Sequence, residues 1–460
     1  VGDGEELLPE LLEKMLVLIE QVGPRTTWAV REREEVLGEL ARIEGVYWPA
    51  GYQPFAAGSY LVPKPMRADL PPRVRMRRIV DLDAAPFPTA PPVPWAQTTH
   101  DRAQIEIARG CVRGCRFCQA GMVYRPVRER SVATLVRQAR TLIANTGYDE
   151  LSLVALNCPD YRRIDELVAA LQAELEGMGV SLGLPSLRVD SVSVGLAQRI
   201  ARVRKGGMTF APEAGTQRLR NVINKNVTDQ DLMDAVGAVF EAGWTTIKLY
   251  FMLGLPTETD EDVDGIADLL AQVAALGRKM LGPRRGRMKL NVSVATFNPK
   301  PHTPFQWFGQ APADVVVQRM QRLRARIRDR AIHLSLHDLG QSQVEAAIAR
   351  GDRLVAEAIE AAWLSGAYLD PWREFFRFDR WQHAFSATGT PLEEWATREI
   401  DLSADLPWDI IDTGISKEFL WREYSMAVEG CPTPDCRAGG CNRCGVQQVL
   451  GGCSGVIGGG

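Results

Sequence analysis

The chain has 460 residues, of which 45% are hydrophobic and 24% charged, and this composition predicts a globular protein with room for a large barrel and one or two smaller domains. Its formal net charge of −3 argues against binding that depends on overall positive charge, whether to nucleic acid or to an anionic membrane. No segment approaches the roughly 20 apolar residues of a membrane span, and no signal peptide opens the sequence. We therefore expect a cytoplasmic protein with no membrane partner.

The first 103 residues form two predicted segments. The turn Gly2-Asp3-Gly4-Glu5 precedes an amphipathic helical pattern, which favours the end of a Rossmann-like domain over residues 1–46, in a chain that begins inside a domain. An ordinary N-terminal helix is the alternative. Residues 47–103 are dense in proline, which disfavours helix and favours extended chain, so we interpret them as a Pro-rich linker.

Residues 104–310 predict an α/β barrel, because short apolar runs alternate there with amphipathic helical stretches. The predicted strands are 104–109, 151–157, 187–194, 207–211, 245–252 and 290–297. The predicted helices are 131–146, 163–178, 195–204, 229–242 and 260–278. Six strands in series favour a partial (β/α)6 barrel, and barrels of this kind carry their chemistry at the C-terminal ends of the strands.

Three cysteines directly follow the first predicted strand. Cys111, Cys115 and Cys118 have the spacing C-x3-C-x2-C, which gathers three thiols in one loop. A cubane iron–sulfur cluster usually takes four thiolates, so three leave one iron with an open position. Structural zinc is the alternative, but it needs a fourth Cys or His, and none lies in the loop. The spacing therefore predicts a [4Fe-4S] cluster with an exchangeable ligand.

The cysteine loop and three later segments resemble the radical S-adenosylmethionine (SAM) superfamily. More narrowly, they resemble uncharacterised bacterial radical SAM proteins related to the cobalamin-dependent class, with a distant, methylthiotransferase-like loop at Asn298–Pro304. The later segments are Thr209 to Lys225, Lys248 to Glu258 and Phe297 to Trp307. The resemblance implies a TIM-like radical SAM barrel in which SAM binds the open iron and is reductively cleaved to a 5′-deoxyadenosyl radical.

The resemblance also implies SAM contacts at several strand ends. These predicted contacts are Phe117, Asn157, Glu213, Arg218, Gly254 and Phe297. The Glu would accept hydrogen bonds from the ribose, and the Arg would bind the SAM carboxylate or a substrate anion. The Asn would face the methionine end, and the Gly and the two Phe would lie against the adenine. Core packing for Phe117, a simple turn for Asn157 and a surface Glu–Arg pair are the alternatives.

The N-terminal turn and helix resemble the last unit of the cobalamin-binding domain that precedes many such barrels. The Asp-x-His-x-x-Gly signature that usually ligates cobalt is absent from the given residues. Cobalamin is therefore unsupported by this sequence, although a longer native chain could supply it.

Two further segments follow the barrel. For residues 311–425 the pattern predicts a helical extension, with a basic helix near 311–330. The many aromatic residues over 366–400 either pack in a core or stack on RNA bases.

For residues 426–460 the cysteine content predicts a metal-binding tail. Its expected ligands are Cys436, Cys441 and Cys444, with Cys431 or Cys453 as the fourth. A second iron–sulfur cluster, structural zinc and free thiols are the alternatives.

The sequence as a whole predicts a radical SAM enzyme that generates a 5′-deoxyadenosyl radical. RNA or a ribosomal component is the expected substrate class, and flavodoxin or ferredoxin the expected reducing partner. A cobalamin-dependent radical SAM methyltransferase is one alternative. An iron–sulfur protein that binds RNA without turnover is the other.

Overall fold

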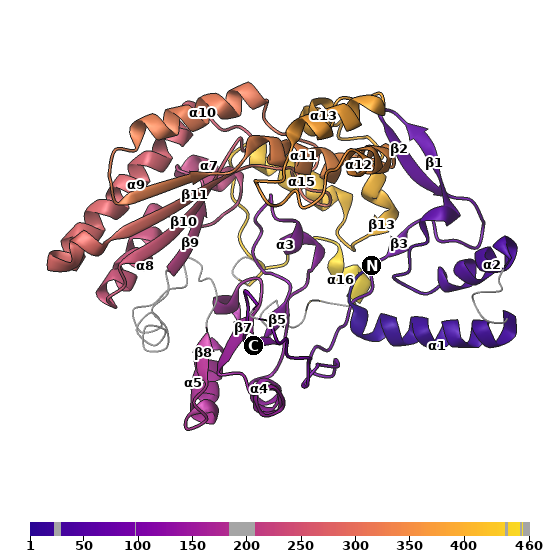
Figure 1. Ribbon diagram of the computed structural model, residues 1–460, viewed down its shortest axis with the longest axis horizontal. Coiled ribbons are helices and arrows are strands. Elements are labelled where there is room, and N and C mark those ends of the chain that lie inside the picture. The colour runs from indigo at the N-terminus through magenta and orange to yellow at the C-terminus, as the bar shows by residue number, and fades with distance from the viewer. Residues whose placement is uncertain (23–28, 97, 184–207, 438–439, 451–452, 454–460) are drawn as a thin grey trace.

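The computed structural model describes residues 1–22, 29–96, 98–183, 208–437, 440–450 and 453 (Figure 1). The described strands are β1 (Tyr52–Ala57), β2 (Tyr60–Pro65), β3 (Val74–Arg75), β4 (Ala103–Glu106), β5 (Ala108–Arg109), β6 (Arg128–Glu129), β7 (Glu150–Val154), β8 (Ser181–Gly183), β9 (Met208–Glu213), β10 (Thr246–Leu253), β11 (Lys289–Thr296), β12 (Ile332–Leu336) and β13 (Ile411–Asp412). Among these described residues, no helix is both long and apolar enough to span a membrane.

The described helices flank these strands along the whole chain. They are α1 (Gly4–Val22), α2 (Val30–Leu40), α3 (Gln119–Val123), α4 (Val132–Thr146), α5 (Ile164–Leu175), α7 (Gln217–Val222), α8 (Asp229–Glu241), α9 (Asp260–Leu281), α10 (Ala313–Arg326), α11 (Leu339–Arg350), α12 (Leu354–Leu364), α13 (Phe378–Ala387), α14 (Leu392–Thr397), α15 (Lys417–Val428) and α16 (Val446–Leu450). Helices α8, α9 and α10 lie on the opposite side of the molecule from α1 and α2 (Figure 1).

Two parallel sheets form the wall of a partial barrel. One has the order β4-β7-β8 and the other β9-β10-β11-β12, so each sheet runs in the order of the sequence, with the separate β5–β6 pair inserted between β4 and β7. Helices connect successive strands, as parallel pairing requires. The fold is therefore α/β with a partial radical SAM-type barrel, as the sequence predicts.

Most predicted barrel elements are confirmed within a few residues. The strand predicted at 104–109 is divided into β4 and β5, and those at 151–157, 207–211, 245–252 and 290–297 correspond to β7, β9, β10 and β11. The predicted strand 187–194 and helix 195–204 lie outside the described residues. Two strands of the parallel sheets were not predicted. Strand β8 pairs with β7, and β12 pairs with β11, so the second sheet continues beyond residue 310.

The two faces of the β9–β12 sheet differ in burial, and this difference locates the interior of the barrel. In β10, Ile247, Leu249 and Phe251 are fully buried and pack with residues of α8 and α9. The alternate residues Lys248 and Tyr250 are exposed. Because successive side chains of a strand point to opposite faces, the helix-covered face is the core, and the other face lines an accessible interior.

Residues 47–103 contain more structure than the predicted linker. Strands β1 and β2 pair as an antiparallel hairpin, with Tyr52 and Tyr60 buried. The hairpin packs on the C-terminal helices, where Tyr60 contacts Trp395 and Trp408 with ring centroids 5.8 and 6.3 Å apart. The domain boundaries predicted from the sequence remain predictions, but this segment is a packed part of the fold.

Some of the basic and aromatic side chains that follow the barrel form ion pairs or are buried in the core, and others are exposed. Within α10, Arg322 pairs with Asp260 and Asp264 of α9, and Arg326 pairs with Asp268. Trp381 and Phe385 of α13 are buried, as core packing predicts. Tyr368, Trp372 and Phe375 are exposed, so this part of the aromatic stretch is accessible to a partner.

Candidate active site

The three barrel cysteines lie in the loop between β5 and α3. The loop begins at Gly110, whose φ of +91° and proximity to the Tyr124 carbonyl, 2.5 Å from a would-be Cβ, admit no side chain. Cys118 is the N-cap of α3, and its sulfur accepts a hydrogen bond from the Gly121 N–H at 3.3 Å. The backbone therefore provides one of the N–H···S contacts expected around a metal-bound thiolate.

The three cysteines of this loop lie close to one another, with Cys115 buried and Cys111 and Cys118 half-buried. Desolvation, followed by the neighbouring Cys115 and Cys118, raises the pKa of Cys111 to about 11. Burial also raises the pKa of Cys118, while the Lys225 ammonium opposes that effect. Thiols with raised pKa values need a metal to hold them as thiolates at neutral pH.

The donor set fits a cluster better than a single ion. A structural zinc ion usually takes four Cys or His ligands, whereas this loop supplies three thiols. A cubane distributes its thiolates over separate irons, so it does not require them to converge on one point. Cys111, Cys115 and Cys118 would therefore hold a [4Fe-4S] cluster and leave one iron without a protein ligand.

Arg116 fixes the cysteine loop from within. The side chain is fully buried, and its Nε donates to Glu423 Oε2 at 3.0 Å. Its terminal nitrogens donate to four more acceptors: the carbonyls of Asn221 (3.1 Å), Val222 (3.0 Å) and Cys431 (2.8 Å), and Thr433 Oγ1 (3.1 Å). A fully satisfied guanidinium thus joins the loop to α7, α15 and the tail.

Glu213 and Lys225 provide a charged wall beside Cys118. Glu213 ends β9 with a φ of +69°, and its carboxylate accepts from Lys225 Nζ at 3.2 Å. The same ammonium lies 5.9 Å from the Phe117 ring centroid. The structure therefore brings two predicted contacts, Glu213 and Phe117, together around a lysine that the sequence argument did not select.

Phe117 and Phe297 share one hydrophobic cluster at this end of the barrel. Phe297 is buried and packs edge-on against Phe305, with ring centroids 5.7 Å apart. Phe117 is partly buried against the same cluster. Asn157 follows β7 and caps a short 3-10 turn that ends at Asp160. All three lie near strand ends, where the resemblance to radical SAM proteins places them.

Arg218 and Gly254 are engaged with protein groups. Arg218 donates to the Thr257 carbonyl at 2.8 Å and pairs with Asp262. The Gly254 N–H donates to Glu258 Oε2 at 2.7 Å, and Arg319 Nη1 lies 2.9 Å from the same carboxylate. Both residues brace the loop after β10, and their predicted contacts with SAM remain predictions.

The tail cysteines divide into two groups. Cys436, Cys441, Cys444 and Cys453 line one small cavity together with Cys111. Cys431 lies outside it, with its carbonyl bonded to Arg116 and its sulfur 3.9 Å from the Glu429 carbonyl. Of the two candidates for the fourth tail position, the cavity therefore includes Cys453 and not Cys431.

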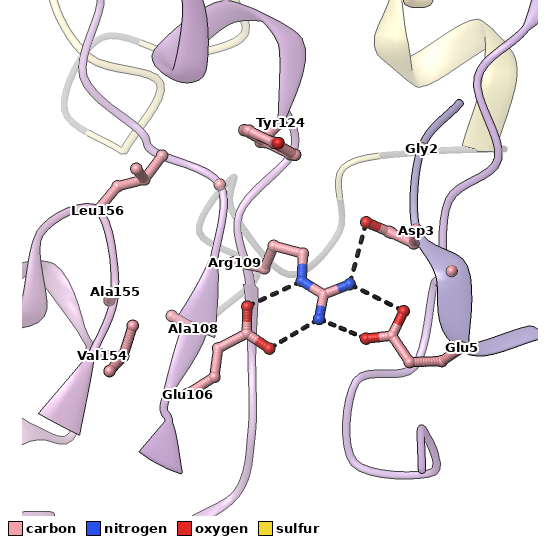
Figure 2. Close-up of a pocket in the computed structure, with 12 residues that line it drawn as sticks. Gly2, Asp3, Glu5, Glu106, Ala108, Arg109, Tyr124, Val154, Ala155 and Leu156 are labelled. Atoms are coloured by element: carbon pink, nitrogen blue, oxygen red, sulfur yellow. Dashed lines mark hydrogen bonds and ion pairs between the residues drawn. The ribbon is translucent and has the colours of Figure 1, made fainter. Parts of the chain in front are cut away.

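A pocket of about 480 Å³ lies where the N-terminal turn meets the barrel. Figure 2 shows the Arg109 guanidinium between Glu106 on one side and Asp3 and Glu5 on the other. The distances are 2.8 Å to Glu106 Oε2, 3.0 Å to Asp3 Oδ1 and 2.5 Å to Glu5 Oε1. These ion pairs attach residues 2–5 to the strand that leads into the cysteine loop, and Gly110 of that loop lines the same pocket.

Part of the chain is similar to known proteins. Residues 105–270 match the Radical SAM superfamily. An uncharacterised protein of Methanocaldococcus jannaschii is 36% identical over 202 residues, which cover 44% of this chain and 42% of the relative. The ribosomal protein uS12 methylthiotransferase RimO of Acaryochloris marina is 26% identical over 243 residues, 50% of this chain and 51% of that protein.

Solved radical SAM structures are similar at lower identity. A radical SAM methyltransferase from Sphaerobacter thermophilus is 22% identical over 52% of this chain and 67% of its own, with a TM-score of 0.34. The radical SAM methyltransferase TsrM of Kitasatospora setae, solved with cobalamin and a [4Fe-4S] cluster, is 13% identical over 62% of this chain and 61% of its own, with a TM-score of 0.39. The chain spans about half the length of the curated relatives described above.

The family match locates one domain of the chain. Residues 105–270 carry a radical SAM domain, the domain found in radical SAM enzymes. That domain implies SAM and a [4Fe-4S] cluster as cofactors. Two residues of the site were not predicted from the sequence: Arg116 and Lys225. The sequence offered one signal for Lys225, because Asn224-Lys225-Asn226 places a cation between two residues that favour turns.

Proposed function

We propose that this protein cleaves SAM reductively to methionine and a 5′-deoxyadenosyl radical, which abstracts hydrogen from a substrate. The observation that carries the proposal is the placement of Cys111, Cys115 and Cys118 in one short loop beside the Glu213–Lys225 pair. A reduced [4Fe-4S] cluster with SAM on its open iron supplies the electron for cleavage.

The protein's own residues would bind and orient the cofactors. The three cysteines bind the cluster, and Arg116 keeps their loop fixed against α7. Glu213 accepts hydrogen bonds from ribose hydroxyls, while Lys225 holds that carboxylate in place. Phe117 and Phe297 exclude water from the adenine side through their shared cluster. Asn157, Arg218 and Gly254 complete the predicted SAM contacts from the neighbouring strand ends.

The substrate would enter through the accessible interior face of the barrel, which carries Lys248 and Tyr250. We propose RNA or a ribosomal component as its class. Support comes from the uS12 methylthiotransferase relative and from the exposed rings of Tyr368, Trp372 and Phe375, on which unstacked bases could pack. Flavodoxin or ferredoxin would supply the electrons. The cytoplasm is the compartment that suits this chemistry, because it is reducing and keeps thiols free.

The direct test is formation of 5′-deoxyadenosine by anaerobically reconstituted protein with SAM and dithionite. We expect a product that depends on all three barrel cysteines. The Cys158→Ala variant is the matched control, because Cys158 is buried in the adjacent part of the barrel and its thiol lies 3.8 Å from a backbone carbonyl. Absence of 5′-deoxyadenosine from the intact, cluster-loaded protein would favour an iron–sulfur protein that binds RNA without turnover.

A cobalamin-dependent methyl transfer is the second candidate. The observation in its favour is the pocket between residues 2–5 and Gly110, which places the N-terminal unit next to the cysteine loop. A corrinoid bound next to this N-terminal unit would supply methyl-transfer chemistry. Binding of hydroxocobalamin by the protein, followed by its visible spectrum, separates the two candidates: a shifted corrinoid spectrum favours methyl transfer, and an unchanged one favours hydrogen abstraction alone.

A further inference from the structure

The four cysteines around the tail cavity are separate from the barrel cysteines in sequence but adjacent to them in space. Cys436, Cys441, Cys444 and Cys453 line this cavity, and Cys111 borders it. The remaining walls are Val112, Pro126, Val127, Val446 and the side chain of Arg125. Among the described residues, no carboxylate or imidazole lines the cavity, so thiols are its metal-binding groups. Thiolates select zinc or iron–sulfur clusters.

Arg125 is the second observation that points to a ligand. The side chain is 95% buried, since its exposed fraction is 5%, and it borders the cavity. Its Nε donates to the Gly121 carbonyl at 3.0 Å and one terminal nitrogen, Nη2, donates to the Arg113 carbonyl at 3.2 Å. The other, Nη1, is buried without a hydrogen-bond partner. A buried guanidinium N–H without an acceptor is costly, and a metal–thiolate centre carries the negative charge that would satisfy it.

The tail is held in this position by a set of ion pairs with the barrel. Asp160 accepts from Arg113 at 2.9 Å and from Arg437 at 3.1 Å. Asp435 lies 3.5 Å from Arg113 and 3.7 Å from Arg437. Each arginine therefore faces both carboxylates, and the segment that precedes Cys441 is anchored beside the cysteine loop. Within the tail, the Arg443 N–H donates to Cys441 Sγ at 3.4 Å.

We propose that Cys436, Cys441, Cys444 and Cys453 bind a second metal centre through four thiolates, with Arg125 donating a hydrogen bond to one of its sulfurs. The centre is a zinc ion or an iron–sulfur cluster, which share this ligand chemistry. The cavity is about 30 Å³, and among the described residues no three of its thiols converge on a single point, so metal binding would require the cysteine side chains to rotate. All four protein ligands are thiolates, so this centre has no position for SAM.

The test measures metal in the full-length protein with Cys115→Ser and Cys118→Ser together, which removes barrel cluster binding but keeps Cys111 at the cavity. Zinc, iron and sulfide are measured after purification and after anaerobic reconstitution. One zinc per chain identifies a zinc site, and bound iron with sulfide identifies a cluster; either result supports a four-thiolate centre. Absence of both metals from folded protein would overturn it.

The ligand assignment is tested in the same background with matched cysteine variants. We expect Cys453→Ser to lose the metal and Cys431→Ser to keep it, because only the first residue borders the cavity. The reverse result would overturn the assignment. Circular dichroism and gel filtration identify any variant that fails to fold. For that case, Arg125→Gln is the second test: we expect metal release to a chelator to become about 10- to 100-fold easier, as for loss of an outer-shell hydrogen bond. Unchanged release would contradict the role of Arg125.

Discussion

The barrel loop and the C-terminal tail both gather cysteines, but their surroundings differ. Beside the loop, the Glu213–Lys225 pair forms a polar wall next to Cys118. Around the tail, the cavity walls are apolar apart from Arg125. Three thiols next to polar groups suit a cofactor that exchanges a ligand, whereas four thiols in an apolar cavity suit a centre closed by protein. The position of a cysteine group relative to polar side chains thus distinguishes a reactive site from a closed one.

The largest effect is expected from removal of a barrel thiol. Cys115→Ala should abolish SAM cleavage, because two thiolates cannot hold the cluster with its open iron in place. The measurement is 5′-deoxyadenosine formed per chain. Metal at the tail should be retained, which iron and zinc analysis of the same sample checks. Retained cleavage in this variant, or in the equivalent variants of Cys111 and Cys118, would contradict the assignment.

The next largest effect is expected where the loop and the tail are joined. Arg116→Met leaves Glu423 buried without its charged partner, and breaking a buried pair in this way costs about 3–5 kcal/mol of unfolding free energy. We expect a lower thermal midpoint together with loss of iron from the barrel. The control is Arg162→Ala, which breaks an exposed pair with Glu129 and should cost less than about 1 kcal/mol. Equal effects of the two variants would show that Arg116 does not join these regions.

Removing the cation beside Cys118 tests the polar wall itself. Lys225→Met deletes the ammonium that pairs with Glu213, so we expect SAM cleavage to fall about 10- to 100-fold, the size of one charge-assisted hydrogen bond. Binding of SAM, measured by equilibrium dialysis, should weaken in parallel. Lys279→Met, on the exposed last turn of α9, is the matched control and should behave as the wild type. A variant with unchanged binding would remove Lys225 from the site.

The smallest effect concerns pH and the loop after β10. Burial raises the pKa of Glu258 to about 7, although the Gly254 N–H and Arg319 oppose that shift. Because the folded-state pKa lies above its ordinary value of 4.5, this group's contribution to stability is complete below pH 4.5 and is lost as pH rises to about 7. Glu258→Gln should remove that dependence in unfolding curves recorded across this range. If the unfolding free energies of the variant and the wild type changed with pH in the same way, this role of Glu258 would be contradicted.

Much of the barrel could be predicted from sequence, because its strands are apolar runs whose periodicity is local. The strands near 151–157, 245–252 and 290–297 were found within a few residues. The strand β12 was missed because its sequence, Ile332–Leu336, is short and half exposed. The hairpin of β1 and β2 was missed because proline density indicated a linker, whereas its prolines are accommodated in a two-stranded edge.

The site was predictable only where its residues are close in sequence. Cys111, Cys115 and Cys118 lie in one loop, so spacing alone identified them. Arg116 binds Glu423 across 307 positions, and no local pattern signals that contact. The sequence also could not decide between Cys431 and Cys453 at the tail, because that choice depends on how the tail folds back on Arg125 and Cys111.

The most direct test of the account is an electron paramagnetic resonance spectrum of the reduced protein with and without SAM. The measurement uses the anaerobically reconstituted Cys436→Ser/Cys444→Ser variant, so that signals from the tail do not overlap those of the barrel. We predict a reduced cubane signal that shifts when SAM is added, because SAM occupies the iron that Cys111, Cys115 and Cys118 leave open. A cubane signal that is indifferent to SAM would mean that protein ligates every iron, and would contradict the radical mechanism.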